Sequence, residues 1–205
     1  MPRAPKAKAS DAAHFADAIV DTALDLAEAQ GWHDLRLYQV AERQGVGLER
    51  ISAHFRDLDA VANAWFARAR DAMLGVREPD LARLPPPERL HRVMMRWFDA
   101  LAPHREVSGE IIREKLWPAH PHHWAPAIFD LSRLMHWFLD AARIASTGRQ
   151  RALAEIGLTL IFIRALRIWL RDDTPGQLRT RAHLMRDLER ADRRLGGRIA
   201  RKVIR

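Results

Sequence analysis

Cysteine is absent from the 205-residue chain, and tyrosine occurs only once. Without cysteine the protein has no disulfide, no thiolate metal site and no cysteine nucleophile, a composition that fits a reducing cytoplasm. The most apolar stretch, residues 156–163, is much shorter than the about 20 residues that a membrane-spanning helix requires. Residues 1–10 form a basic stretch that leads into an amphipathic segment, so they do not form a secretory signal. We therefore expect a cytoplasmic protein, either soluble or peripheral to a membrane.

Residues that favour β-strands are scarce, whereas leucine, alanine and arginine are abundant. Because no stretch shows the alternation of a strand, we predict an all-α fold. Ser10 and Asp57 are predicted caps at the start of two helices, and Thr174 is the predicted cap of the last helix. The prolines of residues 75–87 predict a loop and the clearest break in the chain. Helices are expected near residues 11–30, 58–74, 126–145, 151–171 and 175–195.

The formal net charge of +8 is distributed unevenly along the chain. Residues 1–57 carry seven basic and nine acidic side chains, whereas residues 175–205 carry ten basic and three acidic ones. A basic protein invites a nucleic-acid interpretation. Here, however, the positive charge gathers at the C-terminal end.

The stretch VAERQGVGLERISAHF, residues 40–55, has the spacing of two short helices that meet at a sharp turn. Ala41 is small enough for a close helix crossing, and Gly45 can adopt the positive φ that a tight turn needs. Val46 is expected to fill the hinge, while Ile51 and Phe55 anchor the second helix to the core. This pattern fits a DNA-binding helix-turn-helix, and it also fits a generic helical hairpin.

Residues 18–61 resemble the N-terminal module of TetR-family transcription regulators. The resemblance rests on the pairs Gly31–Trp32, Val40–Ala41 and Gly45–Val46, and on Phe55 at the end of the second helix. It implies a three-helix DNA-binding domain with an N-terminal arm in residues 1–57. It also implies a helical ligand-binding and dimerisation domain in residues 58–205, which residues 58–74 connect to the first domain.

Several positions depart from the family pattern where the family contacts DNA. Leu35–Arg36 stands where a Ser or Thr usually precedes the second helix, and Ser52 stands in place of a Tyr. His54 occupies a position that is often aromatic, and Leu58 replaces the Lys that normally grips the DNA backbone. These losses weaken the expected phosphate contacts.

Six polar side chains around the turn remain as candidate contacts to double-stranded DNA. A guanidinium can grip guanine through two hydrogen bonds, which makes Arg50 the best candidate for a base contact. The other side chains, together with Arg3, Lys6 and Lys8 of the arm, are candidates for the DNA backbone or minor groove. Alternatively, each of these arginines only solubilises the surface. The six candidates are Arg36, Arg43, Arg50, Ser52, His54 and Arg56.

Large apolar side chains recur at helical spacing in the C-terminal half. The family resemblance implies a pocket there for an apolar small molecule or lipid, and a homodimer interface. The same stripes are also what an ordinary helical core requires. We predict no cofactor. The candidate pocket residues are Trp97, Phe98, Trp124, Met135, Phe138, Phe162 and Trp169.

A second, looser resemblance leads to the lipid-binding proteins of ubiquinone biosynthesis, which share this fold without acting as repressors. It rests on residues 117–129, 168–176 and 191–195. It implies an isoprenoid ligand and membrane contact through a late amphipathic helix. Basic residues crowd residues 175–205 around Leu178, Met185, Leu188 and Leu195, so this helix suits anionic lipid. Alternatively, its apolar face packs on its own domain.

Histidines at positions 120, 122, 123 and 136 raise the question of a metal site. No carboxylate or further ligand follows at a recognisable spacing, so we predict no metal. No nucleophile triad, paired carboxylates or phosphate loop occurs, so we predict no enzyme. The leading hypothesis is a ligand-responsive, homodimeric transcription regulator, and the alternative is a lipid-binding accessory protein that does not bind an operator.

Overall fold

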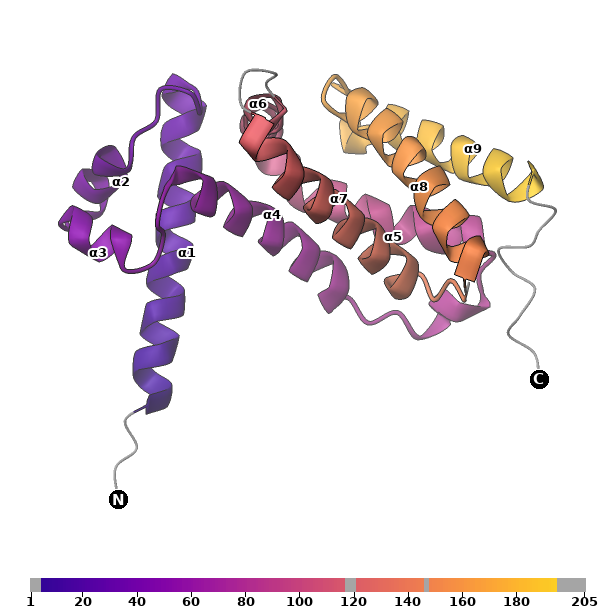
Figure 1. Cartoon of the computed structure of the whole chain (residues 1–205), viewed down its shortest axis with the longest axis horizontal. Coiled ribbons are helices and arrows are strands. Elements are labelled where there is room, and N and C mark those ends of the chain that lie inside the picture. Colours follow the sequence, from indigo (N-terminus) through magenta and orange to yellow (C-terminus); the bar gives the residue numbers. More distant parts are fainter. Residues whose placement is uncertain (1–4, 117–120, 146–147, 195–205) are drawn as a thin grey trace. The chain divides into compact units, whose positions relative to one another are not determined.

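The computed structural model describes residues 5–116, 121–145 and 148–194, except the side chains of residues 5–9, 121–128, 149 and 150. Every regular element within these ranges is a helix, which confirms the all-α prediction (Figure 1). The α-helices are α1 (Pro5–Gln30), α2 (Leu37–Gln44), α3 (Leu48–Ser52), α4 (Leu58–Gly75), α5 (Pro86–Leu101), α6 (Arg105–Lys115), α7 (Pro121–Ala141), α8 (Gly148–Trp169) and α9 (Leu178–Arg194). Three short 3₁₀ turns are η1 (Pro79–Arg83), η2 (Ala102–His104) and η3 (Pro175–Gln177).

The chain divides into two compact units. The first unit joins residues up to 68 with residues 104–114, and the second contains the remainder. Helix α6 belongs to the first unit because its side chains bond to distant segments there. The indole Nε1 of Trp65 donates to Ser108 Oγ at 2.9 Å, and the Trp32 backbone N–H donates to the Glu110 carboxylate at 2.6 Å. The division predicted after residue 57 separates a DNA-binding domain from a ligand-binding and dimerisation domain. It is a division by function, not by compactness, and stays a prediction.

Helix α1 is longer than the sequence predicts, since it begins at Pro5 and contains Ser10 in its interior. The prediction that Ser10 caps this helix is therefore wrong. Residues 6–9 contain no helix breaker, and proline is well tolerated in a first helical turn. The predicted end is confirmed: Gly31 has φ 87° and its N–H donates to Ala27 O at 2.8 Å.

Two further predicted caps had different outcomes. Asp57 caps α4, because its carboxylate accepts the Ala60 backbone N–H at 2.7 Å. Thr174 takes the N-cap position of the 3₁₀ turn η3, not of α9, and its hydroxyl accepts the Arg179 backbone N–H of α9 at 3.2 Å, so the prediction is confirmed in part. Within that turn Gly176 (φ 60°) and Gln177 (φ 59°) have a left-handed backbone. The predicted loop at 75–87 likewise contains the 3₁₀ turn η1 and the first residues of α5.

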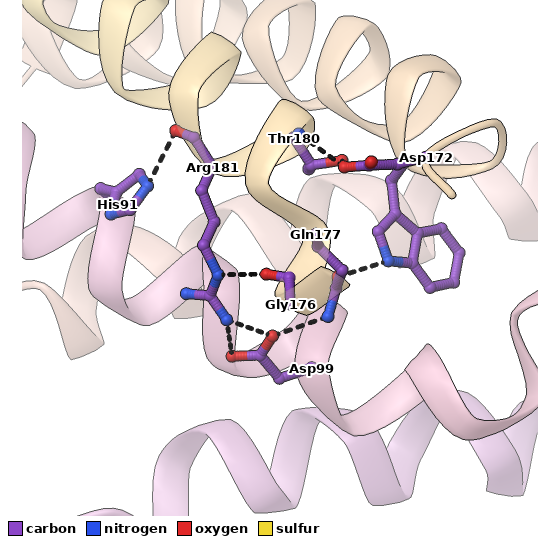
Figure 2. A network of polar contacts seen from close by, with 8 residues as sticks. His91, Asp99, Asp172, Gly176, Gln177, Thr180 and Arg181 are labelled. Atoms are coloured by element: carbon purple, nitrogen blue, oxygen red, sulfur yellow. Dashed lines mark hydrogen bonds and ion pairs between the residues drawn. The ribbon is translucent and has the colours of Figure 1, made fainter. Parts of the chain in front are cut away.

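Asp172 supplies the cap of α9 (Figure 2). Its buried carboxylate accepts hydrogen bonds from the backbone N–H and the hydroxyl of Thr180, at 2.7 and 2.6 Å. Thr174 donates a third bond from its N–H at 3.1 Å. Burial alone would raise the pKa of Asp172, but the hydrogen bonds from Thr174 and Thr180 outweigh it and lower the pKa from 3.8 to about 2.

A second set of polar contacts ties α9 to α5 and α8 (Figure 2). The Asp99 carboxylate on α5 accepts two bonds from Arg181 Nη2, at 2.6 and 2.8 Å, and one from Gln177 at 2.8 Å. Gln177 in turn accepts the indole N–H of Trp169 at 2.7 Å. His91 Nε2 lies 3.0 Å from the carbonyl of Arg181, and burial lowers the pKa of His91. A neutral imidazole that donates from Nε2 fits this position.

Helix α9 packs its apolar face onto its own unit. Leu184 and Leu188 are buried where α9 lies against α5 and α8. The face predicted from the sequence was partly wrong, because Leu178 is exposed and Leu184 takes its place in the core. Leu195 and the basic tail that follows lie outside the described residues. The packed alternative for this helix is therefore the one that the structure supports.

Candidate functional site

The turn between α2 and α3 has the geometry that the sequence predicts. Gly45 is left-handed, with φ 65° and ψ 33°, and its N–H donates to Glu42 O at 3.1 Å. The next N–H, of Val46, donates to Ala41 O at 3.0 Å. A Cβ built on Gly45 would meet no atom within 4 Å. The glycine is therefore needed for its backbone conformation and not for space.

Helix α3 is short and is anchored at its C-terminal end. Ile51 is fully buried, Phe55 is buried just beyond the helix, and the N–H groups of His54 and Phe55 both donate to Ile51 O at 3.0 Å. Leu48, Glu49, Arg50 and Ser52 are exposed. One face of this segment is therefore fixed to the core, and the other is free to contact a partner.

Arg50 and His54 both contact Phe15 of α1. The Arg50 guanidinium carbon lies 4.8 Å from the Phe15 ring centroid, and the His54 ring meets the same ring edge-on with centroids 5.3 Å apart. A cation over an exposed aromatic ring gains about 0.5–1 kcal/mol. Phe15 therefore positions two candidate DNA contacts. Phe15 is not among the six candidates from the sequence, because it lies on α1, far along the chain from the turn.

Arg36 occupies the cap position of α2, where the resemblance leads one to expect a hydroxyl. A guanidinium has no acceptor atom, and here Nη1 donates to the carbonyls of His33 and Leu35, at 2.7 and 2.8 Å. Gln39 completes the end of the helix by accepting the Arg36 backbone N–H at 2.7 Å. The Arg36 side chain therefore closes the preceding loop.

The other three polar candidates have exposed side chains. Arg43 lies in the last turn of α2. The Ser52 hydroxyl donates to Glu49 O at 2.9 Å, and Arg56 pairs with the neighbouring Asp57 at 2.9 Å. Exposed pairs of this kind are weak and are readily exchanged for another anion.

Two exposed apolar side chains on α2 and α3 were not predicted as candidate contacts to DNA. Tyr38 and Leu48 are each 51% exposed. Both are apolar, whereas the six candidates from the sequence are all polar side chains. Apolar side chains at such a surface are able to contact thymine methyl groups.

Six of the seven predicted pocket residues lie together in the core of the second unit. Trp97, Phe98 and Phe162 are buried, with ring centroids 5.3–5.8 Å apart. Trp169 packs 5.5 Å from Phe98, and Phe138 packs 5.7 Å from Phe162. Met135 is also buried. The side chain of Trp124 lies outside the described residues. These rings fill one another's space, and their role in a pocket stays a prediction.

A cavity of about 450 Å³ lies elsewhere in the second unit, beside the C-terminal end of α4. None of the six described pocket candidates lines it. Its apolar lining comes from α4, the segment after it, and the end of α7. These apolar residues are Met73, Leu74, Val76, Pro79, Leu81 and Ala141, and the charged lining residues are Arg77, Glu78, Arg96 and Arg143.

The charges at this cavity are unbalanced. Glu78 pairs with both Arg92 and Arg96. Arg89, only 8% exposed, has a buried Nε without a hydrogen-bond partner. Burial, and then the nearby charge of Arg143, lower the pKa of Arg89. Positive charge therefore exceeds negative charge on this side of α5.

Among the described residues, no three His, Asp or Glu side chains converge as metal ligands. His136 pairs with Glu155 at 2.7 Å, and Glu155 also accepts a bond from Arg151 at 3.1 Å. His120 and the side chains of His122 and His123 lie outside the described residues. In the parts of the chain that the structure describes, no helix combines the length and apolarity that crossing a bilayer requires.

The chain is similar to a protein of solved structure. No model of a protein family matches the chain, and no curated protein matches it. A solved structure is similar to it, the crystal structure of the TetR transcriptional regulator from Nitrosomonas europaea ATCC 19718. The two share 37% sequence identity with a TM-score of 0.77, and the match covers 86% of this chain and 97% of the other.

Proposed function

The chain belongs to the TetR family of transcriptional regulators, and we propose that it is a cytoplasmic regulator that binds operator DNA as a homodimer and responds to a small ligand. Residues 1–57 form the DNA-binding domain in this proposal, and residues 58–205 bind the ligand and form the dimer. The observation that carries it is the turn at Gly45, which fixes α3 through Ile51 and leaves its outer face exposed. The family consists of regulators and not of enzymes.

Arg50 reads a base in this proposal, and Arg43 and Arg56 contact phosphates. A bidentate contact between a guanidinium and guanine contributes about 1–3 kcal/mol of discrimination. Phe15 of α1 restricts the Arg50 guanidinium before binding, which reduces the entropy lost when the contact forms. Arg36 has a structural part, because its donors already serve two loop carbonyls.

Exposed apolar side chains on α7 and α8 support the homodimer. Leu153, Ile156 and Leu160 follow one another on α8 at helical spacing and are each more than 60% exposed. Phe129 and Trp137 are also exposed on α7. Large apolar side chains exposed on two neighbouring helices are typical of a surface that binds a protein partner. A second copy of the same surface would cover it in a two-fold dimer.

The test is fluorescence anisotropy with DNA from upstream of the gene, using the Arg50→Ala variant. Losing the base contact predicts about tenfold weaker binding, from the discrimination of one bidentate pair. Arg83→Ala is the matched control, since Arg83 is equally exposed, pairs only locally with Asp80 and lies in the second unit. Equal affinities for wild type and Arg50→Ala would refute the role of Arg50.

The second candidate is a lipid-binding accessory protein that does not bind an operator. It is favoured by the absence of the usual phosphate-binding side chains at Arg36, Ser52 and Leu58, and by the exposed apolar side chains on α7 and α8. The burial of Leu184 and Leu188 speaks against membrane insertion of α9.

Native mass spectrometry and liposome flotation separate this candidate from the regulator. The lipid candidate predicts a co-purified apolar ligand and binding to anionic vesicles. Removing only residues 195–205 tests the basic tail, whereas removing all of 175–205 would also expose the core that α9 covers. A protein that purifies without a ligand and does not bind vesicles would rule out the lipid candidate.

A further inference from the structure

The cavity at the end of α4 combines an apolar wall with an excess of arginine. Met73, Leu81 and Ala141 lie on its apolar side, and Arg77 and Arg143 contribute charge that no carboxylate among the described residues pairs with. A volume of about 450 Å³ falls within the range of small-molecule sites. Apolar walls bind the body of a ligand, and arginines fix its polar end.

The backbone of Arg143 is unusual for a residue other than glycine. Its φ is 53°, in the left-handed region that glycine normally occupies after a helix. The bonds from Arg143 N to Asp140 O and from Ile144 N to Leu139 O, both 2.9 Å, mark the C-terminal cap of α7. A non-glycine residue in this conformation costs about 1 kcal/mol. A ligand that binds the Arg143 guanidinium would offset this conformational cost.

The acidic side chains around the cavity are already neutralised. Glu78 is shared between Arg92 and Arg96, and Asp140, at the end of α7, pairs with Arg151. Arg77, Arg89 and Arg143 remain on this side, and Arg89 carries the buried Nε without a partner. The local field therefore favours an anion.

We propose that this cavity binds an organic acid, a carboxylate carried on an apolar chain or ring, with Arg143 and Arg77 holding the carboxylate. As an effector site it rests on the proposed regulator function, but ligand binding itself does not. Met73 and Leu74 belong to α4, and this helix begins after its cap Asp57, a few residues beyond α3. A ligand that contacts the end of α4 is therefore placed to bias the conformation of this helix.

Isothermal titration calorimetry of the whole chain without DNA tests the site, with octanoate as the probe and octanol as its neutral counterpart. Octanoate is expected to bind more tightly than octanol. Arg143→Gly is expected to weaken octanoate binding by about tenfold or more, as the loss of a charge-assisted hydrogen bond predicts. Its melting temperature should not fall, because glycine adopts the left-handed conformation freely.

Arg77→Ala provides a second variant, and Arg83→Ala is the control, because Arg83 lies on η1 beside the cavity but does not line it. Weaker octanoate binding in both cavity variants, with wild-type binding in the control, would support the site. Equal binding of octanoate and octanol, or unchanged binding in Arg143→Gly, would overturn it.

Adding octanoate to the DNA titration separates this inference from the proposed function. A shift in DNA affinity with wild type, but not with Arg143→Gly, supports an effector site. If octanoate binds in calorimetry but DNA does not bind at all, the acid site stands and the regulator function is refuted. If DNA binds selectively and octanoate does not bind, the regulator stands and this site is refuted.

Discussion

Arg50 in the first compact unit and Asp172 in the second show two different uses of charge. Arg50 is exposed, and its contact is the face of one aromatic ring. Asp172 is fully buried, and hydrogen bonds from two threonines fix its carboxylate. The first arrangement is easily exchanged for a partner, and the second is costly to disturb. The charge of Arg50 is therefore available for binding, whereas the charge of Asp172 organises the fold.

The largest expected effect comes from removing the charge of Asp172. Asp172→Asn keeps the shape but places an amide against the donors of Thr180 and Thr174. The free energy of unfolding should fall by about 1.5–3 kcal/mol, the range for hydrogen bonds to a charged group. Urea denaturation measures this loss. Asp173→Asn is the control, since Asp173 is exposed and has a long pair with Arg179 at 3.3 Å. Equal losses of unfolding free energy in the two variants would contradict the structural role of the buried Asp172 carboxylate.

Acid should break the same contact in the wild type. The pKa of Asp172 is about 2 in the folded chain against an ordinary 3.8, so its contribution is complete above about pH 4. It is lost as the pH falls from about 4 to about 2, and the shift corresponds to about 2 kcal/mol. Urea unfolding at several pH values tests this loss. Asp172→Asn should lose less stability than wild type over that interval, and parallel curves would contradict the assignment.

Substitution of Gly45 probes the backbone of the first unit. Gly45→Ala forces a side chain into φ 65° and should cost about 1–2 kcal/mol, although no neighbouring atom stands in the way. Gly75→Ala is the control, because Gly75 ends α4 without positive φ and also has open space around its Cβ position. Thermal unfolding followed by circular dichroism compares the two. A Gly75→Ala loss as large as that of Gly45→Ala would contradict the explanation.

The smallest effect concerns Phe15. Phe15→Leu keeps an apolar side chain but removes the ring under Arg50, so the cost is about 0.5–1 kcal/mol of orientation. DNA affinity should fall a few-fold, with little change in melting temperature. In the Arg50→Ala background the same substitution should have almost no further effect on affinity. Independent, additive losses would show that Phe15 acts without Arg50.

Local features of the fold were predictable from the sequence, and long-range ones were not. The turn at Gly45, the end of α1 at Gly31 and the cap at Asp57 depend on neighbouring residues, and all three were confirmed. The cap of α9 was missed because Asp172 lies eight residues before Thr180, across a turn with two left-handed residues. The attachment of α6 through Ser108 was missed for the same reason.

The candidate site shows the same division. Periodicity identified the anchors of α3 and its exposed face, and composition identified the aromatic residues that pack in the second unit. Periodicity does not distinguish a ring that lines a cavity from one that fills the core. The cavity arises from Met73, Arg96 and Arg143, which are distant in sequence and meet only after folding.

The most direct test of the account is an anisotropy titration of the wild-type chain with DNA from upstream of its gene and with a scrambled duplex, at two salt concentrations. A regulator predicts selective binding to the upstream DNA that weakens as salt increases, because phosphate contacts release counterions. Weak and equal binding to both duplexes would contradict the account, and the helix-turn-helix would then be an inherited scaffold without an operator.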